Sequence, residues 1–376
     1  MRIVYVLTSL GIGGAEKQTL AVAERMKKRG HAVALLVMKP RIAEEWPSVL
    51  NTIHLDIRKT PASLFAGFWR ARHFVRAFRP DLLHSHSFHA NLFARCLKLL
   101  VPRLTVLSTI HNVYEGGWWR MLAYRLTGPL CRRAAAVSKA VAQRFVQLKA
   151  VSPQKCVVIA NGIDVAEFVP DPERRLRVRA TLKVSTEEDD FIWLAAGRVT
   201  PAKDYPNLLR AFIQVRSQMP NAKLWIAGAP ADAEVHRAAD GSESFISGIS
   251  LEKDTRERVR FLGLRRDMPA LLDAADAFVS ASAWEGMPLA VGEAMAMATP
   301  VIATDVGGVR ELVGDSGAIV SPENSGALAK AMIVTMQRSV EEREQIGRAA
   351  RERLSRHFSI EASADAWEAL YRELLS

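Results

Sequence analysis

Two carboxylates eight residues apart, Glu285 and Glu293, flank a predicted helix start. A helix of small residues is expected after Pro288, because proline lacks an N–H and is tolerated where a helix begins. The unpaired N–H groups of Leu289 and Ala290 would point toward Glu285 and favour an anion, above all a phosphate. Carboxylates beside a phosphate fit a ligand that also has hydroxyl groups, such as a sugar nucleotide. The alternative is a simple turn whose acids favour the helix dipole without any ligand.

Two cations, Arg198 and Lys203, follow a predicted strand at Phe191–Ala196. They stand beyond its carboxyl end, where parallel sheets bind their ligands. A guanidinium and an ammonium together would neutralise a diphosphate and stabilise it as a leaving group. The alternative is a solvated pair of surface charges.

A glycine-rich turn follows the first predicted strand, Arg2–Leu7, and contains Gly13 and Gly14. Such a turn lets backbone N–H groups approach a phosphate. Glu16 stands where a dinucleotide fingerprint has its third glycine, which argues against NAD. A tight turn that serves packing alone is the alternative.

Three histidines, His84, His86 and His89, have a spacing that resembles a metal-binding cluster. The only acid nearby is Asp81, at the opposite end of the predicted strand Asp81–His86, so we predict no metal site. We expect Ser85 and His86 instead to line a ligand cleft at the end of this strand.

Short apolar runs alternate with amphipathic helical patterns along the 376 residues. This rhythm predicts an α/β protein with two doubly wound parallel sheets, that is, two Rossmann-like domains with a cleft between them. The charged segment Pro170–Asp190 is interpreted as the connection between them. Further strands are expected at Ala32–Met38, Asp81–His86, Thr105–Ile110, Cys156–Ile159, Lys223–Ala227, Val259–Leu262, Ala277–Ala281 and Pro300–Ala303. No apolar run is long enough for a membrane span, and three scattered cysteines indicate free thiols in a reducing cytoplasm.

Positive charge is concentrated between Arg58 and Lys149, a stretch with sixteen Lys or Arg residues and only two acids, Asp81 and Glu115. Tryptophans and phenylalanines are interleaved with these bases. The combination favours peripheral contact of residues 58–149 with an anionic membrane. Nucleic-acid binding is an alternative that rests on this stretch alone.

The Glu285-x7-Glu293 pattern, with Gly286, Pro288 and the following PVIATDVGG, resembles the signature of the family 4 glycosyltransferases. The resemblance implies a GT-B fold and a retaining, metal-independent enzyme without a cofactor. It also implies that Glu285 faces the transferred sugar and that Glu293 holds the ribose. The neighbouring Met287 and Leu289 join the donor site in this interpretation.

The same resemblance extends over nearly the whole chain. It implies that Arg198 and Lys203 hold the donor phosphates, and that the loop at Leu264 reads the nucleotide base through its backbone. His111, after the predicted strand Thr105–Ile110, would sit at the reaction centre. Gly13 and Gly14 would lie near the donor diphosphate, with Glu16 and His86 as candidates on the acceptor side.

The resemblance also divides the chain. Residues 1–165 would form an acceptor-binding domain and residues 166–359 a domain that binds the nucleotide sugar, and the last helix, 360–376, would cross back to the first domain. The polar segment 229–256 departs from the family pattern and is given no role.

We therefore predict a cytoplasmic enzyme, peripheral on the inner face of the cell membrane, in cell-surface glycan biosynthesis. It would transfer a hexose or N-acetylhexosamine from a nucleotide sugar, with UDP favoured, to a lipid-linked or polysaccharide acceptor, such as a polyprenyl-diphosphate glycan. The departing phosphate would receive the proton of the acceptor. The alternatives are a sugar-nucleotide epimerase of the same architecture and, more remotely, a nucleic-acid-binding protein.

Overall fold

The protein is described from a computed structural model that covers residues 1–42, 46, 48–182, 190–228 and 252–376. The chain divides into two compact units, Met1–Gly162 with Ile360–Ser376 and Ile163–Ser359. Residues 229–251, most of the polar segment that departs from the family pattern, lie outside the described part of the chain.

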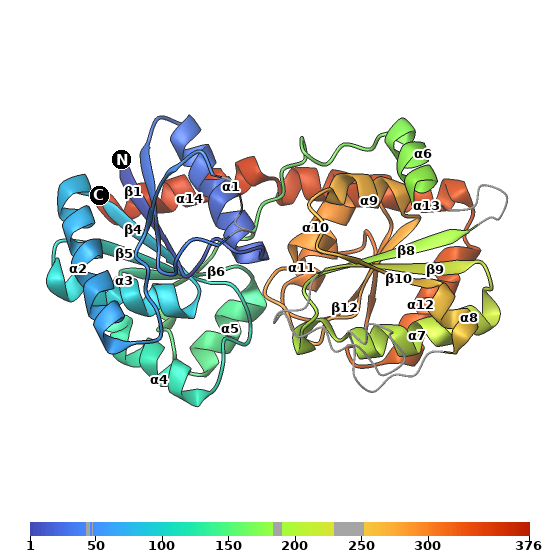
Figure 1. The fold of residues 1–376 in the computed structure, drawn as a ribbon, viewed down its shortest axis with the longest axis horizontal. Coiled ribbons are helices and arrows are strands. Elements are labelled where there is room, and N and C mark those ends of the chain that lie inside the picture. The colour runs from blue at the N-terminus through green and yellow to red at the C-terminus, as the bar shows by residue number, and fades with distance from the viewer. Residues whose placement is uncertain (43–45, 47, 183–189, 229–251) are drawn as a thin grey trace. The chain divides into compact units, whose positions relative to one another are not determined.

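The first unit is built on a parallel sheet in the order β3-β2-β1-β4-β5-β6-β7, with helices on both of its faces (Figure 1). Its strands are β1 (Arg2–Leu7), β2 (Ala32–Val37), β3 (Asn51–His54), β4 (Leu82–His86), β5 (Thr105–Ile110), β6 (Arg133–Ala136) and β7 (Cys156–Val158). Its helices are α1 (Gly14–Lys28), α2 (Pro61–Phe78), α3 (Phe88–Leu100), α4 (Trp118–Thr127), α5 (Lys139–Gln147) and α14 (Ile360–Leu375), with short 3-10 turns at Gly128–Leu130 and Pro153–Lys155.

The second unit repeats this plan with a parallel sheet in the order β10-β9-β8-β11-β12-β13. Its strands are β8 (Phe191–Ala196), β9 (Ala222–Ala227), β10 (Val259–Gly263), β11 (Ala277–Ser280), β12 (Val301–Thr304) and β13 (Ala318–Val320). Its helices are α6 (Pro172–Thr181), α7 (Tyr205–Gln218), α8 (Lys253–Glu257), α9 (Met268–Ala274), α10 (Leu289–Ala296), α11 (Val309–Val313), α12 (Ser325–Gln337) and α13 (Val340–His357), with a 3-10 turn at Pro201–Lys203. The predicted α/β class with two parallel-sheet domains is confirmed.

Alternating residues of β1 serve the two faces of the first sheet, as the period of a strand requires. Val4 and Val6 pack under α2 and α3, whereas Ile3 and Tyr5 pack against α1 and α14. Because both faces are covered, the strand is apolar from Ile3 to Leu7 rather than alternating.

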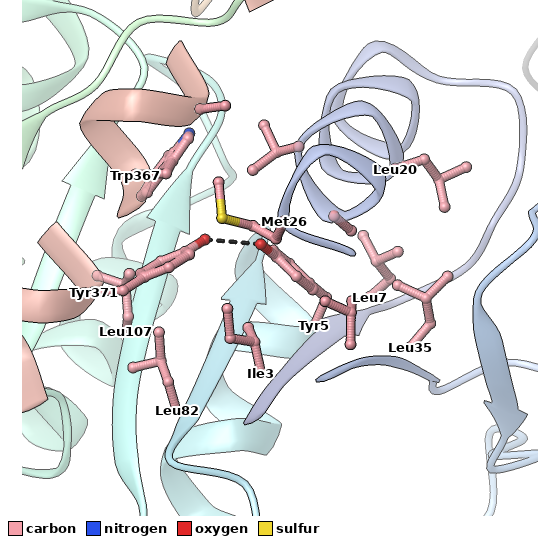
Figure 2. Packing of buried hydrophobic residues seen from close by; sticks show 14 of the residues in the cluster. Ile3, Tyr5, Leu7, Leu20, Met26, Leu35, Leu82, Leu107, Trp367 and Tyr371 are labelled. Carbon is pink, nitrogen blue, oxygen red and sulfur yellow. Dashed lines mark hydrogen bonds between the residues drawn. The ribbon is translucent and has the colours of Figure 1, made fainter. Parts of the chain in front are cut away.

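The final helix, α14, belongs to the core of the first unit (Figure 2). Trp367 and Tyr371 are buried there, and the Tyr371 hydroxyl forms a 3.0 Å hydrogen bond with that of Tyr5. Ion pairs such as Arg25–Glu361, at 2.9 Å, join α14 to α1 along its outer side. The last seventeen residues therefore complete a core that begins with the first strand.

The interpretation of Pro170–Asp190 as a connection was wrong. Residues 172–181 form α6, which packs on α9 within the second unit. Arg174 pairs with Asp273, and Arg179 pairs with Asp276 at 2.6 Å. Since α6 buries no apolar residue and is held by ion pairs, its sequence carries no apolar period.

Three short strands, β3, β6 and β13, were not predicted. Each has three or four residues. β3 and β13 are partly exposed edge strands, which weakens their apolar signal, whereas β6 is buried but has only alanines as apolar residues. The predicted strands were otherwise found to within one residue at each end.

Candidate active site

In the second unit, the candidate donor residues other than Leu264 follow β8 and β11, the neighbouring strands at which the strand order reverses. In open α/β sheets, ligands bind beyond the carboxyl ends of the strands at such a point. The loop after β8 carries Arg198 and Lys203, and the loop after β11 carries Glu285. Sequence order alone separates these loops by about eighty residues, but the sheet brings them together.

Lys203 and Glu285 form an ion pair, with Lys203 Nζ 2.6 Å from Glu285 Oε1. Ser282 Oγ donates to the same carboxylate oxygen at 2.8 Å. The two loops are also joined through the main chain, because the Ala283 N–H donates to the Ala202 carbonyl at 2.9 Å. These contacts hold the acidic and the basic side chain together without a ligand. Ser282 is a further residue of the site, and it was not predicted from the sequence.

A glycine of the VGG sequence after β12 supports the loop that carries Glu285. Gly307 has a φ of +55°, and a Cβ there would overlap the carbonyl oxygen of Glu285. The next residue, Gly308, donates its N–H to the Gly286 carbonyl at 2.7 Å. The resemblance covered this segment, but the close approach to the acidic loop emerges only from the fold.

The predicted helix after Pro288 is α10, with Pro288 as its N-cap and Leu289 as its first residue. No side chain in the described part of the chain caps its N-terminus. Glu293 lies on the second turn and is only 6% exposed, and Met287, in the loop before α10, is also buried. An acid so deeply buried in an apolar helix marks a position with a specific polar contact.

Arg198 and Leu264 are both exposed. Arg198 forms no ion pair within the described ranges and lies at the surface of the second unit. Leu264 follows Gly263, whose φ of +63° turns the chain at the end of β10. Both lie beyond the carboxyl ends of strands, as predicted.

The first unit also reverses its strand order, at β1 and β4. The glycine turn lies beyond β1, and Gly13 is the N-cap of α1 with an extended backbone. Glu16 folds back over this turn, so that a Cβ at Gly13 would overlap its carboxylate oxygen. A side chain at position 13 would therefore displace the Glu16 carboxylate.

The rings of His84, His86 and His111, at the ends of β4 and β5, lie against one another. Both ring nitrogens of His84 are engaged, with the Tyr371 hydroxyl and with Thr109 Oγ1, each at 2.7 Å. His86 Nδ1 lies 2.9 Å from His111 Nε2. No group of three or more His, Cys, Asp or Glu side chains suited to a metal ion occurs among the described residues.

Burial keeps these histidines neutral at physiological pH. It lowers the pKa of His111 to about 4 and holds the pKa of His86 well below its usual range, where the neighbouring His84 and His111 add to the effect. His86 is only 3% exposed and lies behind His111, which is partly exposed. The expectation that Ser85 lines a cleft was wrong, because Ser85 is fully buried and bonded to Asn91.

A carboxylate that the sequence analysis noted only as a charge, Glu115, belongs to this cluster. It accepts hydrogen bonds from the His111 backbone N–H at 3.3 Å and from the Tyr124 hydroxyl at 2.6 Å. Burial raises the pKa of Glu115 to about 7, although both hydrogen bonds act in the opposite direction. Its signal in the sequence was weak, a lone acid four residues after His111 in a basic stretch.

Comparison with known proteins supports this architecture. HepE of Anabaena, in a crystal structure with UDP and glucose, superposes with a TM-score of 0.83 at 20% identity, covering 99% of this chain and 100% of that one. A galactosyltransferase of Escherichia coli, which uses UDP-Gal and α-D-GlcNAc-diphosphoundecaprenol, is 27% identical over 62% of this chain and 60% of its own length. A D-inositol 3-phosphate glycosyltransferase of Kineococcus radiotolerans is 26% identical over 81% of this chain and 76% of its own length.

Two Rossmann-like units with polar groups at each strand-order reversal define the GT-B class of fold. Residues 12–167 match the family model described as Glycosyltransferase Family 4, and residues 179–353 match Glycosyl transferases group 1. The chain belongs to the family 4 glycosyltransferases.

Proposed function

We propose that the protein is a retaining glycosyltransferase that transfers a sugar from a UDP-sugar to a lipid-linked glycan. The observation that carries the proposal is the Lys203–Glu285 ion pair at the strand-order reversal of the second unit, with the exposed Arg198 beyond the same strand as Lys203. Lys203 and Arg198 bind the donor diphosphate, Glu285 orients the transferred sugar, and Glu293 holds the ribose. The base is contacted at Leu264.

The reaction follows from the charges in this site. The acceptor oxygen attacks the anomeric carbon as the bond to the diphosphate breaks, and the acceptor proton passes to the departing phosphate oxygen. Since attack and departure share one face of the sugar, the configuration is retained. Arg198 and Lys203 stabilise the negative charge that develops on the leaving group, and neutral His111 contributes a hydrogen bond to the transferred sugar.

The substrates of two relatives support the choice of substrates for this protein. The Escherichia coli relative takes UDP-Gal and a GlcNAc-diphosphoundecaprenol acceptor. HepE was crystallised with UDP and with UDP-glucose. The proposal can therefore be tested with UDP-galactose and UDP-glucose as donors and GlcNAc-diphosphoundecaprenol as the acceptor. The assay follows UDP release together with the glycolipid product.

Alanine at Lys203 or Glu285 tests the site. Each variant should lose transfer by at least about a hundredfold, because Lys203 stabilises the departing charge and Glu285 orients the sugar, whose misplacement has a similar effect. Glu344→Ala and Arg348→Ala, which break an exposed ion pair on α13, are matched controls and should turn over normally. Near-normal turnover in Lys203→Ala or Glu285→Ala contradicts the assignment.

Two further measurements separate the proposal from its alternatives. Transfer should continue in EDTA, since two cations neutralise the diphosphate without a metal ion; a strict requirement for Mg²⁺ would contradict this. Incubation with UDP-galactose alone should yield no isomerised UDP-sugar. An epimerase would produce it without any acceptor.

Peripheral membrane contact is proposed for the first unit. Helix α4 has four exposed apolar side chains. Trp118, 78% exposed, and Leu126, 70% exposed, lie near its two ends, and Trp119 and Leu122 are exposed as well. On α2, Arg72 lies 4.7 Å from the ring centre of the exposed Trp69. Exposed aromatic and basic residues together fit an anionic lipid surface. Each helix of the described chain is too short or too polar to cross a bilayer.

Vesicle sedimentation tests this contact. Vesicles with phosphatidylglycerol should retain the protein more strongly than phosphatidylcholine vesicles, and the Trp118→Ser/Leu126→Ser variant should bind less. Val340→Ser, a similarly exposed apolar position in the second unit, serves as the control. Stronger retention on DNA than on anionic vesicles would instead favour nucleic-acid binding.

A further inference from the structure

The carboxylate of Glu115 closes the segment that begins at His111 into a fixed loop. One carboxylate oxygen accepts the His111 backbone N–H at 3.3 Å, and the other accepts the Tyr124 hydroxyl at 2.6 Å. The Glu115 main-chain carbonyl accepts from Arg120 Nη1 at 2.5 Å. Tyr124 and Arg120 both belong to α4, so the helix and the loop hold each other.

The same polar network holds the chain on the other side of His111. The Tyr124 hydroxyl accepts from Asn91 Nδ2 at 3.0 Å, and this amide also donates to the Thr109 carbonyl at 2.9 Å. Thr109 lies two residues before His111 on β5. Because Asn91 and Glu115 meet at Tyr124, one network restrains the main chain both before and at His111.

The imidazole of His111 has a separate restraint in its contact with His86, at 2.9 Å. The ring is therefore anchored at one nitrogen and the main chain at its N–H. Two independent hydrogen bonds thus restrain one partly exposed histidine. Hydrogen bonds that lock a side chain in one orientation are typical of groups that must meet a substrate in a set geometry.

We propose that Glu115 is a positioning residue whose carboxylate fixes the His111 main chain and thereby the orientation of its imidazole toward the substrate. The inference rests on the proposed function, in which His111 contacts the transferred sugar. Glu115 itself does not touch the reacting atoms.

Ionisation of Glu115 links this role to pH. The ionised carboxylate accepts from both donors, whereas the protonated group has an O–H that conflicts with one of them. The charged and titratable groups that face it are Tyr124, Arg120, Arg95 and His111, with His86 and His84 behind His111. These histidines are neutral near pH 7, and burial raises the pKa of Tyr124 well above its usual range. The value of kcat should therefore rise with pH through about 7 as Glu115 ionises.

Glu115→Gln and Tyr124→Phe test the role through the pH profile of UDP-galactose turnover. Glu115→Gln should lower kcat on the order of tenfold to a hundredfold, because misplacement of a catalytic group costs that much, and the limb near pH 7 should disappear. Tyr124→Phe removes a hydrogen bond that lowers the pKa of Glu115, so its limb should move to higher pH. Glu373→Gln, the same change at an exposed position of the first unit, should leave both kcat and the limb unaltered. An unchanged limb in Glu115→Gln overturns the proposal.

Backbone hydrogen exchange tests the positioning without any substrate. The amides of residues 110–115 should exchange at least about tenfold faster in Glu115→Gln than in the wild type or Glu373→Gln. A tenfold increase corresponds to about 1.4 kcal/mol less free energy for local opening of the loop. Unchanged exchange there overturns the inference about Glu115 even if the enzyme is active. If the amides exchange faster in Glu115→Gln but the wild-type protein transfers no sugar, the positioning role of Glu115 stands and the proposed function is refuted.

Discussion

Replacing Glu115 with glutamine should increase the stability of the protein relative to the wild type as the pH rises, because it removes a buried carboxyl group whose ionisation the folded state disfavours. Burial raises the pKa of this carboxyl from 4.5 to about 7 in the folded state. Between these values the folded state binds a proton that the unfolded state has released. The free energy of unfolding therefore falls as pH rises from about 4.5 through about 7.

The size of the effect follows from the pKa shift. With one pKa unit worth about 1.4 kcal/mol, the wild type should lose about 2 to 3 kcal/mol relative to Glu115→Gln between pH 5 and pH 8. Lost hydrogen bonds to His111 and Tyr124 add a nearly constant offset, because neither partner titrates between these pH values. The test is therefore how the difference in unfolding free energy between the two proteins changes with pH, not the absolute value of that difference.

Thermal unfolding of both proteins across this pH range provides the assay. For a domain of this size, 1 kcal/mol shifts Tm by about 2–4 °C, so the difference should grow by about 5–10 °C in favour of Glu115→Gln. A Tm difference that does not change with pH, or that changes in favour of the wild type, would refute a raised pKa of Glu115. The same slope in Glu373→Gln would show that the effect is not specific to position 115.

Three further outcomes follow from the contacts described. Gly307→Ala should lower the free energy of unfolding by about 1–2 kcal/mol, because its backbone is left-handed. It should also reduce transfer, because the new Cβ overlaps the Glu285 loop. Gly30→Ala, at φ +86° with open space around it, should show only the backbone effect in thermal unfolding. Tyr371→Phe should destabilise by about 2–4 kcal/mol, because it leaves two buried partners unpaired, whereas Tyr5→Phe should cost about 1 kcal/mol, since Tyr371 keeps His84. Arg198→Ala should change stability by less than about 0.5 kcal/mol yet weaken the thermal shift produced by UDP; a large loss of stability would give this exposed guanidinium a structural role.

Local pattern was enough to predict most of the elements and the ends of the strands. β1 and β5 appear with the predicted bounds, because a parallel strand buried on both faces reads as a short, mainly apolar run between turns. The helix start after Pro288 was predicted for a similar reason, since proline and small residues restrict the backbone there. Helix α6 escaped prediction because ion pairs, which have no sequence period, hold it in place.

By itself, the sequence determined the chemistry available to this protein: two acids eight residues apart, a pair of cations after a strand, and a glycine turn. Tertiary structure alone decided which of these groups meet. It joins Lys203 to Glu285 across eighty residues, places Gly307 against the same loop, and turns Glu115 inward to His111. The physical reason is that parallel strands distant in sequence end at one edge of a sheet, so the partners of a polar group are set by strand order rather than by spacing.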